Sequence, residues 1–217
     1  MIKDVIKEIE EKKIIAIIRG VEKDKMLPLV GALRDGGITL AEVTFAANRP
    51  DEETAETIRD LVRNFSDDMA IGSGTTLTEK QVELTHSVSG RFVISPDVNE
   101  AVIGKTKELG MISIPGALTP TEIVKAARAG ADFVKLFPIT GLGAEYVKAV
   151  KAPLSNVKLL AVGGIDANNM SEYLRAGVLG FGIGSKLTDR KLIENNDWKG
   201  ITALAKAFVT AAHNAAK

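Results

Sequence analysis

Two hydrophobic patterns alternate along the chain. Short runs dominated by Ile, Val, Leu and Ala are typical of strands buried on both faces of a parallel sheet. Between them, apolar residues recur three and four positions apart, which is the spacing of an amphipathic helix. Strands are predicted at 13–20, 40–45, 69–75, 91–96, 111–116, 130–138, 157–164 and 179–185. Helices are predicted at 1–13, 24–35, 51–65, 78–88, 99–109, 119–129, 144–150, 168–176 and 198–212.

The order of these elements predicts the fold. After an opening helix, eight strand–helix units follow in strict alternation, which favours a parallel sheet covered by helices. Eight units close a (β/α)8, or TIM, barrel, and 217 residues suit a small member of that class. An open doubly wound sheet is the alternative, but no predicted strand precedes a complete Gly-x-Gly-x-x-Gly turn. We expect one α/β domain, 1–217, folded as a (β/α)8 barrel with an extra N-terminal helix.

Composition narrows the function classes. Lys plus Arg and Asp plus Glu each number 28, so the formal net charge is zero and no nucleic acid partner is indicated. Cys is absent, which excludes disulfides and thiolate metal sites. No uncharged run reaches the length of a membrane span, and the first residues do not resemble a signal peptide. We therefore expect a cytoplasmic protein that has no membrane or nucleic acid partner.

The predicted strand at 130–138 contains a lysine among apolar residues. Lys135 has Val134 on one side and Leu136 on the other, and burying an ammonium there is costly. In one interpretation the lysine side chain extends to solvent or pairs with a carboxylate. In the other, it lies inside the barrel, where burial lowers its pKa and leaves a neutral amine able to attack a carbonyl.

The carboxyl ends of barrel strands form the active-site face, so the residues there indicate the chemistry. These are Arg19, Glu42, Thr75, Ser95–Pro96, Pro115–Gly116, Lys135, Gly163–Gly164 and Gly184–Ser185. Because side chains alternate between the two faces of a strand, Glu42 is predicted on the face opposite to that of Ala41 and Val43. It is either a structural partner of Lys135 or a general acid/base, and the two roles are compatible.

Two glycine-rich turns follow the last two strands. Backbone N–H groups at Gly163–Gly164 and Gly184–Ser185 would form a phosphate site, although glycines also end strands for steric reasons. Arg19 would bind the same anion or a substrate carboxylate, or else form a structural salt bridge. His86 and His213 share no ligand spacing, so no metal site is predicted.

Several stretches together resemble one family. They are 37–44, 72–75, 94–96, 114–116 with 119–122, 134–138, 162–165 and 184–185. In this order they are similar to the class I 2-keto-3-deoxy-6-phosphogluconate (KDPG) aldolases, a family that includes the 4-hydroxy-2-oxoglutarate (KHG) and 6-phosphogalactonate aldolases. The resemblance covers nearly the whole chain.

The resemblance implies a function and a set of site residues. The chain would reversibly cleave KDPG to pyruvate and glyceraldehyde 3-phosphate without a cofactor, as a homotrimer acting in carbohydrate breakdown of the Entner–Doudoroff type. Lys135 would form the Schiff base and Glu42 would shuttle protons. The implied substrate-binding residues are Arg19, Thr75, Pro96, Phe137, Gly163, Gly164, Gly184 and Ser185.

Two departures keep alternatives open. KDPG aldolases often carry Arg four residues after the glutamate, where this chain has Ala46, and Arg49 is a candidate replacement. They also tend to have Thr where this chain has Val162. The resulting Ala-Val-Gly-Gly sequence, with Arg19, looks more like the 6-phosphogalactonate aldolases. A non-catalytic phosphosugar-binding barrel is the alternative from another class. An isomerase or synthase barrel is disfavoured because one amine faces one carboxylate.

Overall fold

The computed structural model describes residues 5–215 and has nine parallel strand segments, which together form an eight-stranded barrel. The strands are β1 Ile14–Ile18, β2 Leu40–Thr44, β3 Ala70–Gly74, β4 Phe92–Ile94, β5 Ile112–Ile114, β6 Gly116–Ala117, β7 Val134–Leu136, β8 Leu159–Val162 and β9 Gly180–Ile183. Their order around the sheet is β5-β4-β3-β2-β1-β9-β8-β7-β6, and every pairing is parallel. The labels β5 and β6 denote two halves of one barrel strand.

Pro115 divides this strand. Proline has no backbone N–H, so it cannot donate a ladder hydrogen bond. Its carbonyl still accepts from Lys135 N at 2.9 Å, and Ser113 O accepts from Phe133 N at 3.3 Å. Since β5 pairs with β4 and β6 pairs with β7, this strand closes the barrel. The single strand predicted at 111–116 is therefore interrupted, but the predicted barrel is confirmed.

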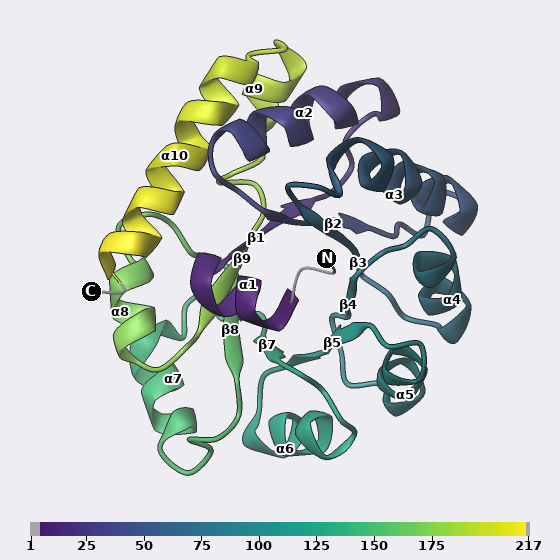
Figure 1. The fold of residues 1–217 in the computed structure, drawn as a ribbon. Coiled ribbons are helices and arrows are strands. Elements are labelled where there is room, and N and C mark those ends of the chain that lie inside the picture. Colours follow the sequence, from purple (N-terminus) through teal and green to yellow (C-terminus); the bar gives the residue numbers. More distant parts are fainter. Residues whose placement is uncertain (1–4, 216–217) are drawn as a thin grey trace.

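Ten helices surround the strands within the described residues. They are α1 Val5–Lys12, α2 Lys23–Asp35, α3 Asp51–Phe65, α4 Glu79–Ser87, α5 Glu100–Glu108, α6 Pro120–Arg128, α7 Gly143–Lys151, α8 Met170–Arg175, α9 Arg190–Glu194 and α10 Trp198–Ala215. Figure 1 shows α2 to α8 and α10 as a ring outside the strands, with α1 across one end of the barrel. The predicted opening helix is confirmed from residue 5, and its residues 1–4 lie outside the described part.

The short helix α9 is absent from the sequence prediction. It has five residues, too few for a helical hydrophobic period to be recognised. Asp189 caps it, accepting a hydrogen bond from Leu192 N at 3.0 Å. Lys25 of α2 donates from Nζ to the carbonyls of Ile193 and Glu194, both at 3.1 Å. These contacts explain how so short a helix is held in place.

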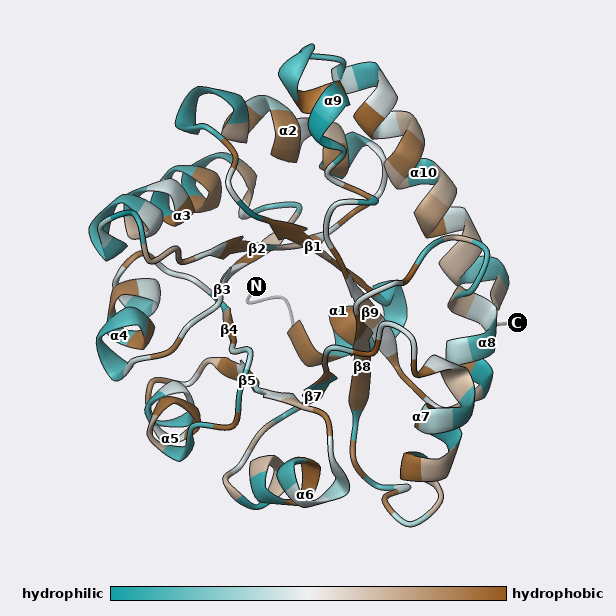
Figure 2. Cartoon of the chain, turned by 180° about the vertical axis from the view of Figure 1, so that it is seen from behind, coloured by the Kyte–Doolittle hydropathy of each residue, from teal (hydrophilic) through white to brown (hydrophobic). Residues whose placement is uncertain are grey.

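Two apolar layers support the barrel. The larger lies between the strands and the outer helices, and Figure 2 shows hydrophilic residues concentrated on helices and loops outside it. The smaller fills the barrel interior, where Leu40, Phe92 and Phe133 are buried together with Val5 and Ile9 of α1. These apolar side chains close the amino end of the barrel, which leaves the carboxyl end as its open face. Within residues 5–215 no helix is long and apolar enough to cross a bilayer.

Candidate active site

Lys135 lies in β7 and points into the upper barrel interior. Its parallel register places it opposite Gly116 on one side and Leu160 on the other. Only 6% of the residue is exposed, and its Nζ lies 4.5 Å from the centroid of the Phe137 ring. Burial is the largest influence on the ammonium and lowers the pKa of Lys135 from its ordinary 10.5. The site therefore increases the neutral fraction of this amine near neutral pH.

Glu42 lies in β2, and the neighbouring strand leaves space for its carboxyl group. The residue is 1% exposed. A Cβ at Gly74 would lie 2.6 Å from Glu42 Cδ, closer than real Cβ contacts come, so any side chain at position 74 would displace the carboxylate. Gly72 pairs in register with Glu42, and a Cβ at Gly72 would clash with the Phe92 ring of β4. Each glycine of the Gly-x-Gly sequence is required by a specific neighbour.

The amine and the carboxylate influence each other without direct contact. Burial raises the pKa of Glu42, and the positive charges of Lys135 and Arg19 oppose this increase. Glu42 in turn opposes the lowering of the pKa of Lys135. The ion pairs among the described residues do not include one between Lys135 and Glu42, and Glu42 Oε2 has no hydrogen-bond partner there. An unsatisfied buried carboxylate oxygen is costly, and such groups are concentrated at functional sites.

Arg19 and Thr75 form a polar pair beside the acid. Arg19 Nη2 donates to Thr75 Oγ1 at 3.2 Å. Thr75 has a φ of 53°, in the left-handed region, which a β-branched residue adopts only when its surroundings hold it there. The following residue, Thr76, is anchored by Ser73 Oγ at 3.0 Å and by the Ile94 carbonyl, which accepts from its N–H at 3.1 Å.

A large cavity opens beside Lys135 at the carboxyl end of the barrel. Its volume is about 700 Å³. Ile17, Val162 and Gly182 line both this cavity and a small deeper void that contains Glu42. Five basic and two acidic residues line the cavity, so the cavity carries more positive than negative residues although the whole chain has no net charge. The basic residues are Arg19, Lys25, Lys135, Lys186 and Arg190. The cavity is therefore suited to a small anion that reaches the amine.

The two predicted glycine turns lie in this cavity. Gly163 and Gly164 have φ values of 107° and 71°, which L side chains rarely adopt. Crowding adds to this, because a Cβ at Gly163 would lie 2.9 Å from Thr140 Oγ1. Within the described residues, the backbone N–H groups of Gly163, Gly164 and Ser185 donate to no protein acceptor. Free N–H groups converging on a cavity form a binding surface for an anion.

The predicted site residues divide into three groups. The cavity is lined by Arg19, Lys135, Phe137, Gly163, Gly164, Gly184 and Ser185. Glu42 lies in the deeper void, and Thr75 is connected to the cavity through Arg19. Pro96 lines neither space, and its backbone lies close to Gly116. Its role in substrate binding stays a prediction.

Arg49 is the candidate replacement for the arginine missing at Ala46, and that role stays a prediction. Its Nη2 lies 3.4 Å from Glu22 Oε1, and it does not line the cavity. Lys186 and Arg190 also line the cavity but were absent from the sequence prediction. Their approach to the cavity depends on where the segment that leads into α9 lies, which the sequence does not indicate. Arg190 Nε lies 2.6 Å from Glu194 Oε1.

No group of potential metal ligands occurs among residues 5–215.

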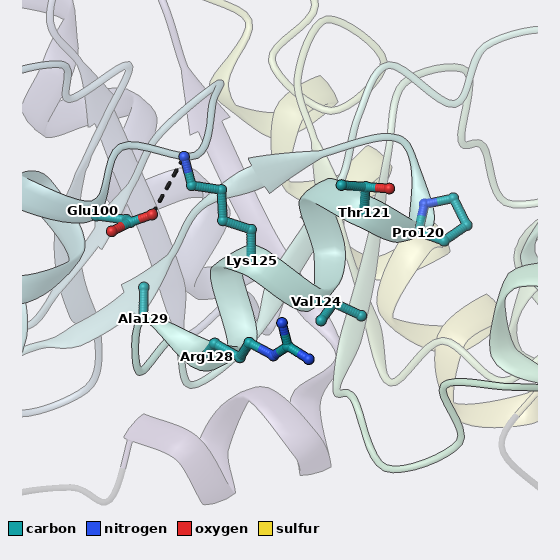
Figure 3. A pocket seen from close by; sticks show the side chains of 7 residues that line it. All are labelled: Glu100, Pro120, Thr121, Val124, Lys125, Arg128 and Ala129. Atoms are coloured by element: carbon teal, nitrogen blue, oxygen red, sulfur yellow. Dashed lines mark ion pairs between the residues drawn. The ribbon is translucent and has the colours of Figure 1, made fainter.

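A second cavity of similar size lies on the outside of the helix ring. It is lined by Glu100 of α5 and by residues of α6, including Lys125 and Arg128. Figure 3 shows Lys125 reaching toward Glu100, and the Nζ–Oε1 distance is 3.3 Å. Both partners are exposed, so this is an ordinary surface ion pair. The groove has no buried nucleophile or acid, and the chemistry belongs to the barrel mouth.

The barrel mouth defines a class of protein: an amine-based carbonyl enzyme, with the amine and an acid held above an apolar plug. Comparison with known proteins supports this class. Residues 5–204 match the family described as KDPG and KHG aldolase, and the chain belongs to this family. Its members are carbon–carbon lyases.

Individual relatives narrow the comparison. A probable 2-dehydro-3-deoxy-6-phosphogalactonate aldolase of Rhizobium meliloti (strain 1021) is 39% identical over 82% of each chain. A solved structure described as native KDPGal is 34% identical, with a TM-score of 0.85, and the match covers 94% of this chain and 95% of that one. A KDPG aldolase from Legionella pneumophila, captured with pyruvate as a covalent carbinolamine, is 30% identical with a TM-score of 0.82, covering 91% and 94%.

Proposed function

We propose that this protein is a Schiff-base aldolase that reversibly cleaves KDPG to pyruvate and glyceraldehyde 3-phosphate. The observation that carries the proposal is the buried Lys135 amine between the anion-binding cavity and the Glu42 carboxyl group. The Legionella relative, in which pyruvate is bound as a carbinolamine, supports the same chemistry.

The proposed reaction begins at Lys135. Its neutral amine attacks the C2 ketone, and the carbinolamine loses water to give a protonated imine. The imine accepts the electrons of the C3–C4 bond as that bond breaks, which releases glyceraldehyde 3-phosphate and leaves an enamine. Protonation at C3 and hydrolysis then release pyruvate and restore the amine. Because the imine is the electron sink, the proposed mechanism uses no metal or cofactor.

Glu42 is the proposed proton carrier. It takes the proton of the C4 hydroxyl as C3–C4 breaks and returns a proton to C3 of the enamine, directly or through a water molecule. Burial supports this role because it raises the pKa of Glu42 above its ordinary value, in the direction that favours a general acid. The unpartnered Oε2 atom is available for such a transfer.

The two ends of the substrate would be bound by different groups. Arg19, fixed by Thr75, is the proposed partner of the carboxylate. The free N–H groups of Gly163, Gly164 and Ser185 are the proposed phosphate ligands. Because the phosphate is remote from C3–C4, its binding energy positions the substrate for reaction.

The C4 epimer, 2-keto-3-deoxy-6-phosphogalactonate, is the second candidate substrate. Val162 favours it, because an apolar wall stands where a threonine would offer a hydroxyl, and so does the Rhizobium relative. An apolar wall discriminates weakly between epimers. We expect the kcat/KM values for the two epimers to agree within roughly tenfold, about 1.4 kcal/mol in transition-state binding. A thousandfold preference for either would show that Val162 is not the determinant.

Borohydride reduction in the presence of pyruvate tests the catalytic proposal. The reduced pyruvoyl group should be attached to Lys135, and peptide mass spectrometry would locate it. An unmodified Lys135, or loss of activity on adding EDTA, would contradict the mechanism. A lactate dehydrogenase assay of pyruvate release tests the alternative of a non-catalytic phosphosugar-binding barrel, which would show binding without turnover.

Assembly and location complete the proposal. We infer a homotrimer from the family resemblance, and a cytoplasmic location from the sequence. Light scattering should give about three times the 23.1 kDa mass of one chain. A mass near that of one chain would contradict the trimer.

A further inference from the structure

Ile17 differs from its neighbours in β1. Every other residue of that strand is buried, whereas Ile17 is only partly buried. Ile15 and Ile17 both point into the barrel, but Ile15 lines only the deeper void. Ile17 also lines the large cavity, and it pairs in register with Glu42 of β2. Its exposed surface therefore faces the cavity directly beside the proposed acid.

Gly182 of β9 provides the space that Ile17 occupies. A Cβ there would lie 3.2 Å from Ile17 Cδ1 and 2.9 Å from Val162 Cγ2. Since β9 lies between β1 and β8, the two side chains lean over Gly182 from opposite sides. Gly182 does not have a positive φ, so the requirement for glycine here is one of space. Ile17 and Val162, meeting over Gly182, form an apolar wall.

The apolar wall lies between the two ends of the site. All three of its residues line the deeper void together with Lys135 and Glu42. On the other side, a Cβ at Gly184 would lie 3.8 Å from Ile17 Cβ, so the wall continues to the proposed phosphate turn. If the substrate ketone is bound at Lys135 and its phosphate at that turn, then C4 and C5 of the substrate lie against the apolar wall.

This placement distinguishes the two hydroxyl groups of the proposed substrate. The C4 hydroxyl reacts, and Glu42 is its proposed partner. The C5 hydroxyl has no role in bond cleavage, and the wall offers it no hydrogen bond. We propose that Ile17, seated over Gly182, is a specificity-determining residue that presents an apolar surface to C5, so that cleavage does not depend on the C5 hydroxyl. This inference rests on the proposed aldolase function.

The test compares KDPG with its 5-deoxy analogue, using pyruvate release to measure kcat/KM. A site that hydrogen-bonds a substrate hydroxyl rejects the analogue lacking it by roughly 10⁴-fold or more, whereas apolar contacts discriminate far less. The wild-type ratio of the two kcat/KM values should be about ten or less. A ratio above about a hundred would overturn the proposal.

Matched variants isolate the side chain. Val and Thr have nearly the same shape, so Ile17→Val and Ile17→Thr differ at the wall by one hydroxyl. The preference for KDPG over its analogue should be at least about tenfold greater in Ile17→Thr than in Ile17→Val. Equal preferences in the two variants would refute a role for Ile17. Ile15→Val, on the same face of β1 but outside the large cavity, should keep the wild-type preference.

Pyruvate trapping separates this inference from the proposed function. Pyruvate has no C5, so its attachment to Lys135 by borohydride in the wild type tests Schiff-base formation independently of any contact with C5. Failure to trap pyruvate in the wild type would contradict the aldolase mechanism itself. Normal trapping with a large dependence on the C5 hydroxyl would overturn only the role assigned to Ile17.

Discussion

Replacing Glu42 by methionine should inactivate the protein and make it more stable. Methionine has a similar length and no charge, so it occupies the space beside Gly74 without a buried carboxylate. The wild-type side chain is almost completely buried, and one of its oxygens has no hydrogen-bond partner in the described structure. The fold therefore tolerates an energetically unfavourable group, and its proposed benefit is catalytic.

The magnitude follows from the unsatisfied oxygen. Leaving a buried polar atom without a partner costs about 1–3 kcal/mol, so the free energy of unfolding should rise by roughly that amount. The lost attraction between Glu42 and Lys135 acts in the opposite direction, but burial is the larger influence on the pKa of Glu42. For a chain of this length the expected increase in Tm is about 2–12 °C. Loss of the general acid/base should lower kcat by about 10²–10⁴-fold.

The gain in stability should depend on pH. Burial raises the folded-state pKa of Glu42 above its ordinary 4.5. Below pH 4.5 the carboxyl group is neutral in both states, and the wild type is least penalised. As the pH rises through the folded-state pKa, the wild type loses this stability and the variant does not. The difference in Tm should therefore grow between pH 4 and neutral pH.

Calorimetry and pyruvate release measure the two effects. Glu145→Met is the matched control, because it makes the same substitution at an exposed carboxylate of α7, and it should leave Tm and kcat nearly unchanged. A Glu42→Met variant that is several degrees less stable than the wild type would refute the argument from the unpartnered oxygen. A variant with normal kcat would refute the proposed role in proton transfer.

Other substitutions and conditions test separate parts of the site. Gly74→Ala should lower kcat at least about tenfold by displacing Glu42, whereas Gly104→Ala, whose Cβ would meet nothing within 4 Å, should not; equal rates in the two variants would contradict the steric argument. Because burial lowers the pKa of Lys135, the rate of borohydride trapping should rise with a midpoint below pH 10.5, and a midpoint at or above that pH would contradict this shift. Lys125→Ala in the outer groove should change the free energy of unfolding by less than about 1 kcal/mol and leave kcat/KM unaltered; a large loss of activity would assign that groove a role in catalysis.

Much of the architecture could be predicted from local sequence signals. Apolar runs and helical periods recur eight times, and this alternation specifies a parallel barrel because each helix must return the chain to the same edge of the sheet. Lys135 and Glu42 were recognisable because a charged residue in a buried strand is rare and costly. The sequence prediction placed both at the carboxyl ends of their strands, whereas the structure has each in the middle of its strand, lining the void inside the barrel.

Contacts between distant segments could not be predicted in the same way. Arg19 and Thr75 are 56 positions apart, and their hydrogen bond exists only because β1 and β3 flank the same strand. The requirement for glycine at position 74 likewise depends on a contact between strands, because a Cβ there would meet the carboxyl group of Glu42 in β2. Helix α9 is held by Lys25, 168 positions from Ile193, so its sequence alone gave no adequate signal.

The strand pattern by itself thus determined which residues enter the barrel, because burial and period are local properties of the chain. Only the tertiary structure decided which of them meet. Ile17, Val162 and Gly182 belong to three strands, and none is unusual in its own segment. The closure of the barrel brings their surfaces together, since a side chain from one strand can occupy the space that a glycine leaves on the next.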